Sequence, residues 1–489
     1  MKGDFTRFDF DSSKHFSRVL QQQGRVAIDS DANESSAIAL HHLRTLTKDL
    51  FGAFGGPANS GFSLAVDSSA SPRTLWIGPG HYWVDGIMTE NEKWTDYAAQ
   101  PDYQPAPPDN SGAGGDDVLG FLRQPNVDSA FWLYLDVWER HVSWIEDDSI
   151  REPALGGPDT CSRARVVWQV KALPWDSQRW GDSGAGNENA CPAPLPSLPT
   201  LGTARLAAQV DPGQAFTDPC TIAPAAAYRG AENQLYRVEV HTGGDASTAT
   251  FKWSRENGSV ATRWLGNGND AQALVVKSSR GFSANDWVEL THDALDLAGQ
   301  PGQLVRLSLV DGDQLIVDSA GGAPMAWSAN FLNPKVRRWD QRGNDVVPLR
   351  AGAVPVAESS STPITWIDLE DGVQVAFEAG GGYRSGDYWL IPARVATQGI
   401  VWPQEDGYPA LQLAQGIGHA YAPLGVLSFS GQQIQVRPCR NCAGLSRVAC
   451  DLPPAPIPAA ERRAVAKRPS TRPAPAAVSG RTPKKRSRP

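Results

Sequence analysis

The chain has 489 residues, which at about 150 residues per domain indicates about three domains and rules out a small scaffold stapled by disulfides. Its net charge of −8 averages two unlike parts. Residues 453–489 hold ten Lys or Arg and one acid, a net of +9, whereas the preceding body holds 35 basic and 52 acidic residues, a net of −17. Such an acidic body is a poor nucleic-acid binder, which argues against a DNA-wrapping protein.

The composition predicts a mainly β protein. Glycine (47), proline (38) and tryptophan (17) are plentiful and methionine is scarce (3), which favours short strands and turns over long helices. We expect several antiparallel β units, sandwich or barrel-like, behind an N-terminal helical segment and followed by a disordered C-terminal tail. Residues 1–16 lack an apolar signal-peptide core and no apolar run reaches 18 residues, so the sequence predicts a soluble, cytoplasmic protein with mostly reduced thiols.

The first predicted element is a helix in an N-terminal adaptor. Asp31 and Glu34 resemble a capping box, and leucines recur at helical spacing from Leu43 through Leu46 to Leu50, before Gly52. The helix therefore has one apolar face.

The organisation predicted along the whole chain is a helical adaptor at 1–60, a first β domain at 61–175, a Pro/Gly-rich connecting loop at 176–228, a second β domain at 229–350, a third β unit at 351–451, and a disordered basic, Pro-rich tail at 452–489.

Alternating residues predict the strands of the first β domain. Leu75 to Glu90 indicates three strands joined by a Gly-Pro-Gly turn at 78–80 and a tight Asp-Gly turn at 85–86, a compact hairpin unit. Phe131 to Ile145 has strand composition, and its predicted partner is Arg163 to Ala172. Glu146-Asp147-Asp148 follows as a predicted solvated turn.

The second β domain and the third β unit show the same signals. From about Leu235, apolar and polar residues alternate. Leu304 to Val310, a turn at 311–312 and Gln314 to Asp318 indicate a hairpin, and Asp371-Gly372 marks another turn.

No motif assigns a catalytic site or a cofactor. A nucleophile elbow, a P-loop, a dinucleotide fingerprint and an HExxH pair are all absent from the sequence. Cys439, Cys442 and Cys450 are weak candidates for a zinc site, because three soft ligands lie close together without a fourth. Free thiols and a local disulfide are the alternatives.

One aromatic strand face is the best candidate for binding a ligand or partner. Trp132, Tyr134, Asp136 and Trp138 share a face by their spacing of two. Aromatic side chains stack on sugars, and glycan hydrolases need two carboxyls about 5 to 9 Å apart, so Asp136 is the candidate acid of such a site. The alternative is that this face is the interior of a sandwich.

Several strings together resemble a bacterial family of unknown function that is encoded beside the sheath, tube and baseplate genes of contractile phage-tail-like injection systems. They include IGPGHYWVDGIMTEN from residue 77, YRGAENQLYRVEVH from 228, GDYWLIPAR from 386 and GHAYAPL from 418, and the match runs from residue 1 to about 430. The residues carrying the family-like motifs are Gly80, Tyr82, Asp85, Gly86, Asp387, Trp389, Arg394 and His419.

The resemblance implies a non-enzymatic structural component of a tail-like particle, at the baseplate or its fibres, and brings no catalytic residues. Its partners would be other tail or baseplate proteins, with a homo-oligomer as one form of assembly. It would assemble in the cytoplasm into a particle that can be released. Nucleic acid or membrane would be reached only through the basic tail. The alternatives are a glycan-binding module or glycan hydrolase acting on the target envelope, and an effector loaded into the particle.

Overall fold

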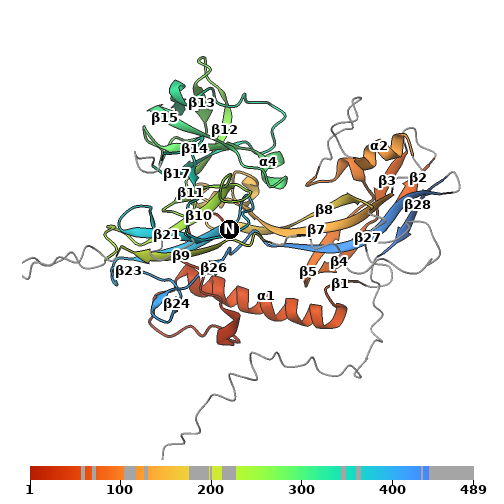
Figure 1. The fold of residues 1–489 in the computed structure, drawn as a ribbon, viewed down its shortest axis with the longest axis horizontal. Coiled ribbons are helices and arrows are strands. Elements are labelled where there is room, and N and C mark those ends of the chain that lie inside the picture. Colours follow the sequence, from red (N-terminus) through yellow and green to blue (C-terminus); the bar gives the residue numbers. More distant parts are fainter. Residues whose placement is uncertain are drawn as a thin grey trace, which may run out of the picture. The chain divides into compact units, whose positions relative to one another are not determined.

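The computed structural model describes residues 1–56, 61–68, 73–103, 117–125, 130–175, 198, 201–211, 227–342, 348–359, 365–430 and 433–439. The expected disordered tail at 452–489 lies outside these residues. Within them the protein is mainly β, with several antiparallel sheets and an N-terminal helix, as the composition predicts. Three separate apolar cores divide the described chain into three β units (Figure 1).

The first β unit packs a four-stranded antiparallel sheet, ordered β28-β27-β7-β8, against two small sheets, β1-β4-β5 and β2-β3-β6. Its strands are β1 (Phe54–Gly55), β2 (Leu64–Asp67), β3 (Thr74–Ile77), β4 (Gly80–Val84), β5 (Ile87–Asn91), β6 (Thr95–Asp96), β7 (Ala130–Val142), β8 (Arg163–Pro174), β27 (His419–Ser430) and β28 (Gln433–Pro438). Leu133, Leu135 and Val137 of β7 face this core because alternate residues of a strand share a face. The predicted pairing of β7 with β8 is confirmed, as is the β4–β5 hairpin.

The second β unit is a sandwich of two sheets, ordered β18-β11-β10-β22-β23 and β19-β21-β9-β26 with β20 beside β21. Its strands are β9 (Arg205–Val210), β10 (Gln234–Thr242), β11 (Thr250–Ser254), β18 (Val354–Pro355), β19 (Glu358–Ser359), β20 (Ile367–Asp368), β21 (Val373–Glu378), β22 (Tyr388–Arg394), β23 (Gly399–Ile400) and β26 (Gln412–Leu413). A small ribbon, β24 (Gln404–Glu405) with β25 (Tyr408–Pro409), adjoins it. Val238, Phe251 and Trp389 of the first sheet pack against Val375 and Phe377 of the second.

The third β unit is a closed six-stranded barrel, ordered β12-β13-β16-β15-β14-β17. Its elements are β12 (Ala261–Asn267), β13 (Ala273–Val276), β14 (Trp287–Thr291), α4 (Asp293–Leu297), β15 (Gln303–Asp311), β16 (Gln314–Val317) and β17 (Lys335–Trp339). The predicted hairpin across residues 311–312 is the β15–β16 pair. The barrel strands lie between β11 and β18 in the sequence. The chain therefore leaves the sandwich after β11, forms the barrel and returns to the sandwich at β18.

The predicted boundaries along the chain differ from the sheets that form. β27 pairs with β7 of the first unit and β28 pairs with β27, although both strands fall in the stretch expected to be a third unit. β9 pairs with β21 inside the sandwich, although residues 205–210 fall in the expected connecting loop. The sequence shows local strand signals, whereas these pairings join segments more than 100 residues apart.

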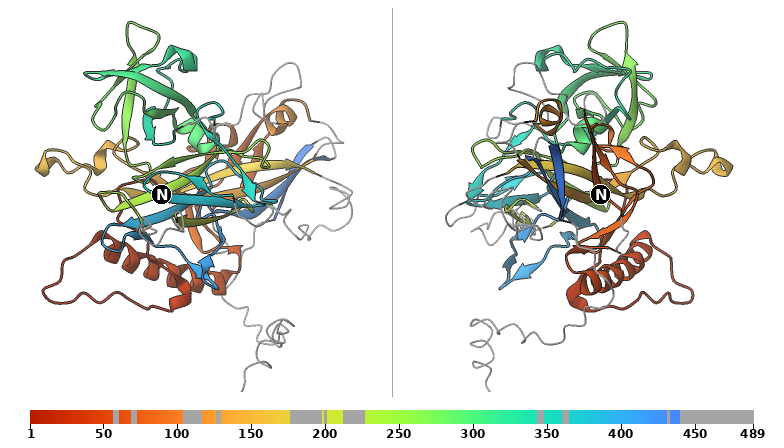
Figure 2. Two further views of the ribbon diagram at one scale, coloured as in Figure 1. Left: turned by 60° about the vertical axis from the view of Figure 1, so that its left-hand side comes forward. Right: turned by 90° about the vertical axis from the view of Figure 1, so that its right-hand side faces the viewer.

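The described part of the chain has few other helices. They are α1 (Asp29–Phe51), α2 (Asp117–Arg123) and five short 3-10 turns at Ser12–Lys14, Tyr97–Ala99, Asp148–Ile150, Pro153–Leu155 and Ser319–Gly321. Helix α1 lies on the opposite side of the long strands from the barrel (Figures 1 and 2). It begins at Asp29, and the expected capping box is wrong: Ile28 is the N-cap residue and makes no side-chain cap bond. Asp29 instead accepts a hydrogen bond from the Thr6 backbone, at 2.9 Å.

Helix α1 packs on the β4–β5 hairpin through one narrow face. Arg44 pairs with Glu139 of β7 at 2.9 Å, Lys48 pairs with Asp85, and Phe51 stacks on Trp83. Only three of its residues are buried: Ser30, Ile38 and Thr47. The predicted apolar face, with Leu43, Leu46 and Leu50, points to solvent instead of a core.

The Gly86→Ala substitution tests how closely α1 approaches the hairpin. Gly86 has φ +77°, and a Cβ there would lie 2.5 Å from the Arg44 carbonyl oxygen in α1. Gly312→Ala is the matched control, since Gly312 also follows Asp in a turn, has φ +58° and has nothing within 4 Å of its Cβ position. In urea unfolding, we expect the positive φ to lower the free energy of unfolding of both variants by about 1 kcal/mol. The clash with Arg44 should lower that of Gly86→Ala by about 1–3 kcal/mol more. Equal losses would contradict the packing.

Candidate functional site: a buried charged junction

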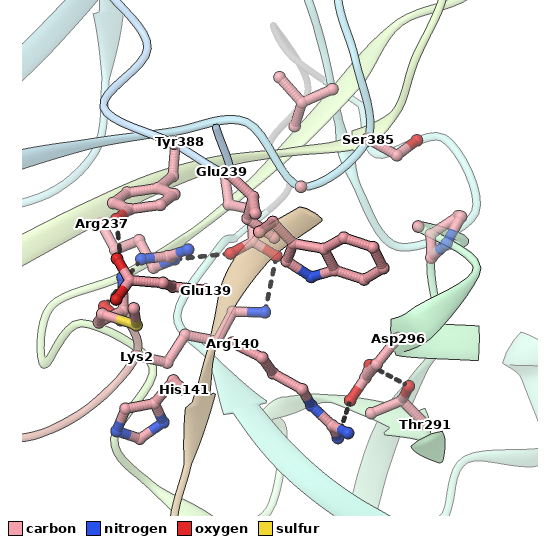
Figure 3. A pocket seen from close by; sticks show the side chains of 18 of the residues that line it. Lys2, Glu139, Arg140, His141, Arg237, Glu239, Thr291, Asp296, Ser385 and Tyr388 are labelled. Carbon is pink, nitrogen blue, oxygen red and sulfur yellow. Dashed lines mark hydrogen bonds and ion pairs between the residues drawn. The ribbon is translucent and has the colours of Figure 1, made fainter. Parts of the chain in front are cut away.

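A cavity of about 360 Å³ lies where the three β units and the first two residues of the chain meet. Its charged lining comes from the N-terminus, β7 and the loop after it, the sandwich strands β10 and β11, and α4, β14 and β17 of the barrel. In Figure 3, Tyr388, Arg237 and Glu239 gather at one end, and Arg140, Asp296 and Thr291 at the other. We call this region the junction.

Strand β10 supplies the polar wall of the junction. Its alternation places Tyr236, Val238 and Val240 in the sandwich core and leaves Arg237, Glu239 and His241 on the opposite face. That polar face is buried too, because the barrel and the N-terminus cover it. The alternation is visible in the sequence, but the burial of the polar face by the barrel and the N-terminus is not.

Lys252 of β11 connects the sandwich to the barrel. It lies directly opposite Glu239 in the β10–β11 register, with 3.3 Å between its Nζ and Glu239 Oε1. Its Nζ also donates to Glu289 Oε1 of β14, at 2.5 Å. One buried amine therefore pairs with a carboxylate from each of two β units.

Glu289 is held from several directions. Trp339 Nε1 donates to one of its oxygens at 2.9 Å and the Gly302 backbone N–H donates to the other at 3.1 Å. The Lys252 ammonium also lies 4.5 Å from the centre of the Trp339 ring, a cation–π contact. These contacts fix the carboxylate where Lys252 meets it.

The N-terminal residues cover the sandwich end of the junction. Lys2 Nζ pairs with Glu239 at 2.9 Å, and the Met1 carbonyl accepts a hydrogen bond from Arg237 at 3.2 Å. Arg237 also pairs with Glu239 at 2.6 Å and stacks over the Tyr388 ring at 3.6 Å. Three cations thus surround Glu239, since Lys2, Arg237 and Lys252 all contact it.

A second cluster joins the first β unit to the barrel. Lys335 of β17 pairs with Glu146, which follows β7, at 2.5 Å, and with Asp296 of α4 at 2.7 Å. Arg140 of β7 pairs with Asp293 of α4 and approaches Asp296 to 3.6 Å. The prediction of a solvated turn is wrong for Glu146, which is buried against Lys335.

Burial and ion pairing shift the pKa values of the junction in opposite senses. Burial raises the pKa of Glu289 and Glu146, but Lys252 beside the first and Lys335 beside the second more than offset it, and both pKa values fall to about 2. Burial lowers the pKa of His241 to about 4. The depressed carboxylate pKa values stabilise the fold above the usual value of 4.5, and this stabilisation is lost as the pH falls toward 2. His241 adds to the loss between pH 6.5 and about 4, where the unfolded chain binds its proton first.

The predicted aromatic face of β7 is buried, with Trp132, Tyr134, Asp136 and Trp138 all largely inaccessible. Asp136 is 2 % exposed; its Oδ2 accepts from Lys171 Nζ at 2.7 Å and its Oδ1 contacts His419 Nδ1 at 2.6 Å. Burial raises its pKa, but His419 and Lys171 together hold that pKa below its ordinary value. His419 also stacks on Trp138.

The family-like motif residues have structural contacts. In the β4–β5 hairpin, Gly80 begins β4, Tyr82 is fully buried and Asp85 and Gly86 form the turn under α1. His419 contributes to the Asp136 pair described above.

The motif residues of the sandwich are hydrogen-bonded to distant backbone. Asp387 accepts from the Gly202 N–H at 2.7 Å, and burial raises its pKa to about 6. Trp389 donates to the Gln412 carbonyl and Arg394 to the Thr6 carbonyl, each at 2.8 Å.

The cysteine predictions have mixed outcomes. Cys439 is disulfide-bonded, so the expectation of a reduced thiol is wrong there, and a disulfide sulfur is not a thiolate ligand for zinc. Cys442 and Cys450 lie outside the described residues. Cys161 is free and exposed. Within the part of the chain that the structure describes, no three His, Cys, Asp or Glu side chains are grouped to hold a metal ion.

Sequence reasoning missed the residues that make the junction, above all Lys252, Glu289 and Lys335. Lys252 lies between Phe251 and Trp253 in a short strand, and this alternation is equally typical of a lysine on a solvent-exposed sheet face, so it gives no local signal of a buried ion pair. Nothing local identifies Glu289 as its partner, because the contact depends on how the barrel is inserted.

Fold and site together define a multi-unit antiparallel β protein with a charged junction between its cores. The chain matches the model of a family of unknown function, DUF6519, over residues 1–179 and 195–489, and it belongs to that family. No curated protein and no solved structure matches it. Among the described residues, no helix has the length and apolar character needed to cross a membrane.

Lys252→Met tests the junction. It leaves Glu289 buried without its closest cation, so we expect a loss of about 3–5 kcal/mol in the free energy of unfolding. Lys48→Met is the matched control, because Lys48 pairs with Asp85 on the surface and its loss costs under about 1 kcal/mol. Urea unfolding measures both, and similar losses would contradict a role for the junction in stability.

Proposed function

We propose that the chain is a non-enzymatic structural component of a contractile phage-tail-like particle, associated with its baseplate or fibres. The shared sequence strings described above support the link to such particles. A row of exposed leucines on α1, here called the ridge, supports a role in assembly and is the observation on which the proposal depends.

The ridge consists of Leu43, Leu46 and Leu50, which are exposed on one face of α1, and Leu43 also lines a groove between α1 and the β4–β5 hairpin. Leu46 is 56 % exposed and Leu50 is 58 % exposed. Large apolar side chains aligned on one helix face are typical of a surface that a partner protein covers. Other proteins of the particle are the partners that this surface would bind.

The competing hypothesis of a glycan hydrolase has less support. Its best candidate acid, Asp136, is buried and has both oxygens bound by Lys171 and His419. A catalytic pair of carboxyls must flank a sugar with room between them. A carboxylate closed in by two basic side chains does not present itself to a sugar. The hypothesis of a loaded effector depends on the basic tail, which lies outside the described residues.

Leu46→Glu/Leu50→Glu tests the ridge. We expect the variant to fold normally, because both side chains are exposed, and to fall at least tenfold in abundance in purified particles, since each buried charge would oppose docking. Leu309→Glu is the matched control, as Leu309 is an equally exposed leucine on the barrel. Quantitative mass spectrometry of intact particles measures all three chains.

Absence of the unmodified chain from intact particles would contradict the proposal itself. Normal incorporation of the ridge variant would show that α1 is not the docking surface.

A further inference from the structure

An exposed arm precedes α1. Residues 11–28, here called the arm, are exposed except for the half-buried Val19. The arm presents the large apolar side chains of Phe16 and Leu20 to solvent. Its three cations, Lys14, Arg18 and Arg25, form no ion pair with any described residue. Within its own chain the arm therefore has exposed apolar side chains and cations that are not ion-paired with any described residue.

A groove of about 510 Å³ lies between α1 and the β4–β5 hairpin. Its floor is apolar and includes Leu40, Trp83 and Met88, while Glu90 and Glu92 stand on its rim. The other carboxylates of the lining, those of Glu139 and the buried Asp102, are paired with arginines, but Glu90 and Glu92 pair with no cation in the described part of the chain. The groove therefore offers an apolar floor beside free negative charge.

The arm and the groove complement each other in both respects. The arm carries apolar side chains spaced among unpaired cations, and the groove carries apolar floor residues beside unpaired carboxylates. No residue of the arm lines the groove within the same chain. We infer that the groove binds the arm of a second copy of this chain, with Phe16 or Leu20 on the floor and Arg18 beside Glu90.

Such a contact joins two different surfaces of identical chains. A heterologous contact of this kind repeats from copy to copy and closes into a ring or continues as a filament. Repeated copies are what a structural component of a particle supplies, so the inference rests on the proposed function and specifies one of its contacts. The contact between copies involves the arm and the groove, whereas docking to other particle proteins would involve Leu46 and Leu50 of the ridge.

A charge exchange in the full-length chain tests the inference. Sedimentation equilibrium over a range of concentrations measures self-association of the unmodified chain, Arg18→Glu, Glu90→Arg and the double variant. We expect each single variant to weaken association by roughly tenfold and the double variant to recover it, because the pair is restored with its signs reversed. Glu405→Arg is the matched control, an exposed carboxylate of β24 outside the groove.

Folding is checked by circular dichroism, and because Arg18 and Glu90 are both exposed, all variants should melt with the unmodified chain. Association that rises in low salt and is weakened by Phe16→Ser/Leu20→Ser would support the contact. A chain that stays monomeric at every concentration would overturn it, as would association that none of the arm or groove variants changes.

These results separate the inference from the particle proposal. A monomeric chain that is still found in intact particles would refute the arm contact alone. A chain that self-associates as described but is absent from particles would refute the particle proposal and leave the arm contact standing.

Discussion

The pairing of Lys252 with Glu239 and Glu289 is the constraint on which the arrangement of the β units depends. The three main apolar cores are separate, and among the described residues one small cluster of Leu304, Trp339 and Ala353 joins the barrel to the segment leading into β18, so apolar burial alone does little to fix how the units meet. The buried amine of Lys252, which lies between carboxylates from two units, does fix their arrangement. Separating the two units would leave buried charges without partners. Lys335, between Glu146 and Asp296, does the same between the first unit and the barrel. Separating one partner of such a pair leaves an uncompensated buried charge, so the pairs penalise other arrangements of the units.

Much of the local structure could be predicted from the sequence. The β7–β8 pair, the turn at Asp85-Gly86 and the hairpin before Asp318 all follow from alternation and turn chemistry, which act over a few residues. The pairing of β27 with β7 and the insertion of the barrel could not be predicted, because they depend on contacts between distant segments. For the same reason the polar face of β10 gives no local sign that it is covered.

The candidate site shows the same limit. The sequence singles out Asp136 and His419 separately, and only the fold shows that they contact each other beside Trp138. Burial decides the interpretation of that face, which is closed and not an open groove. The surfaces proposed for partners are the ridge of α1, the arm before it and the groove, and the ridge and the arm lie in the predicted N-terminal adaptor.

Differential scanning calorimetry at about pH 7 and about pH 3 tests the central claim most directly, because at the first pH Glu146 and Glu289 are ionised whether the junction is closed or open, whereas at the second they stay ionised only while it is closed. The account predicts one cooperative transition at neutral pH, in which all three β units unfold together. At the acidic pH it predicts separate transitions, since opening the junction lets Glu146 and Glu289 bind protons. Independent transitions already present at neutral pH, or a single transition at both, would contradict it.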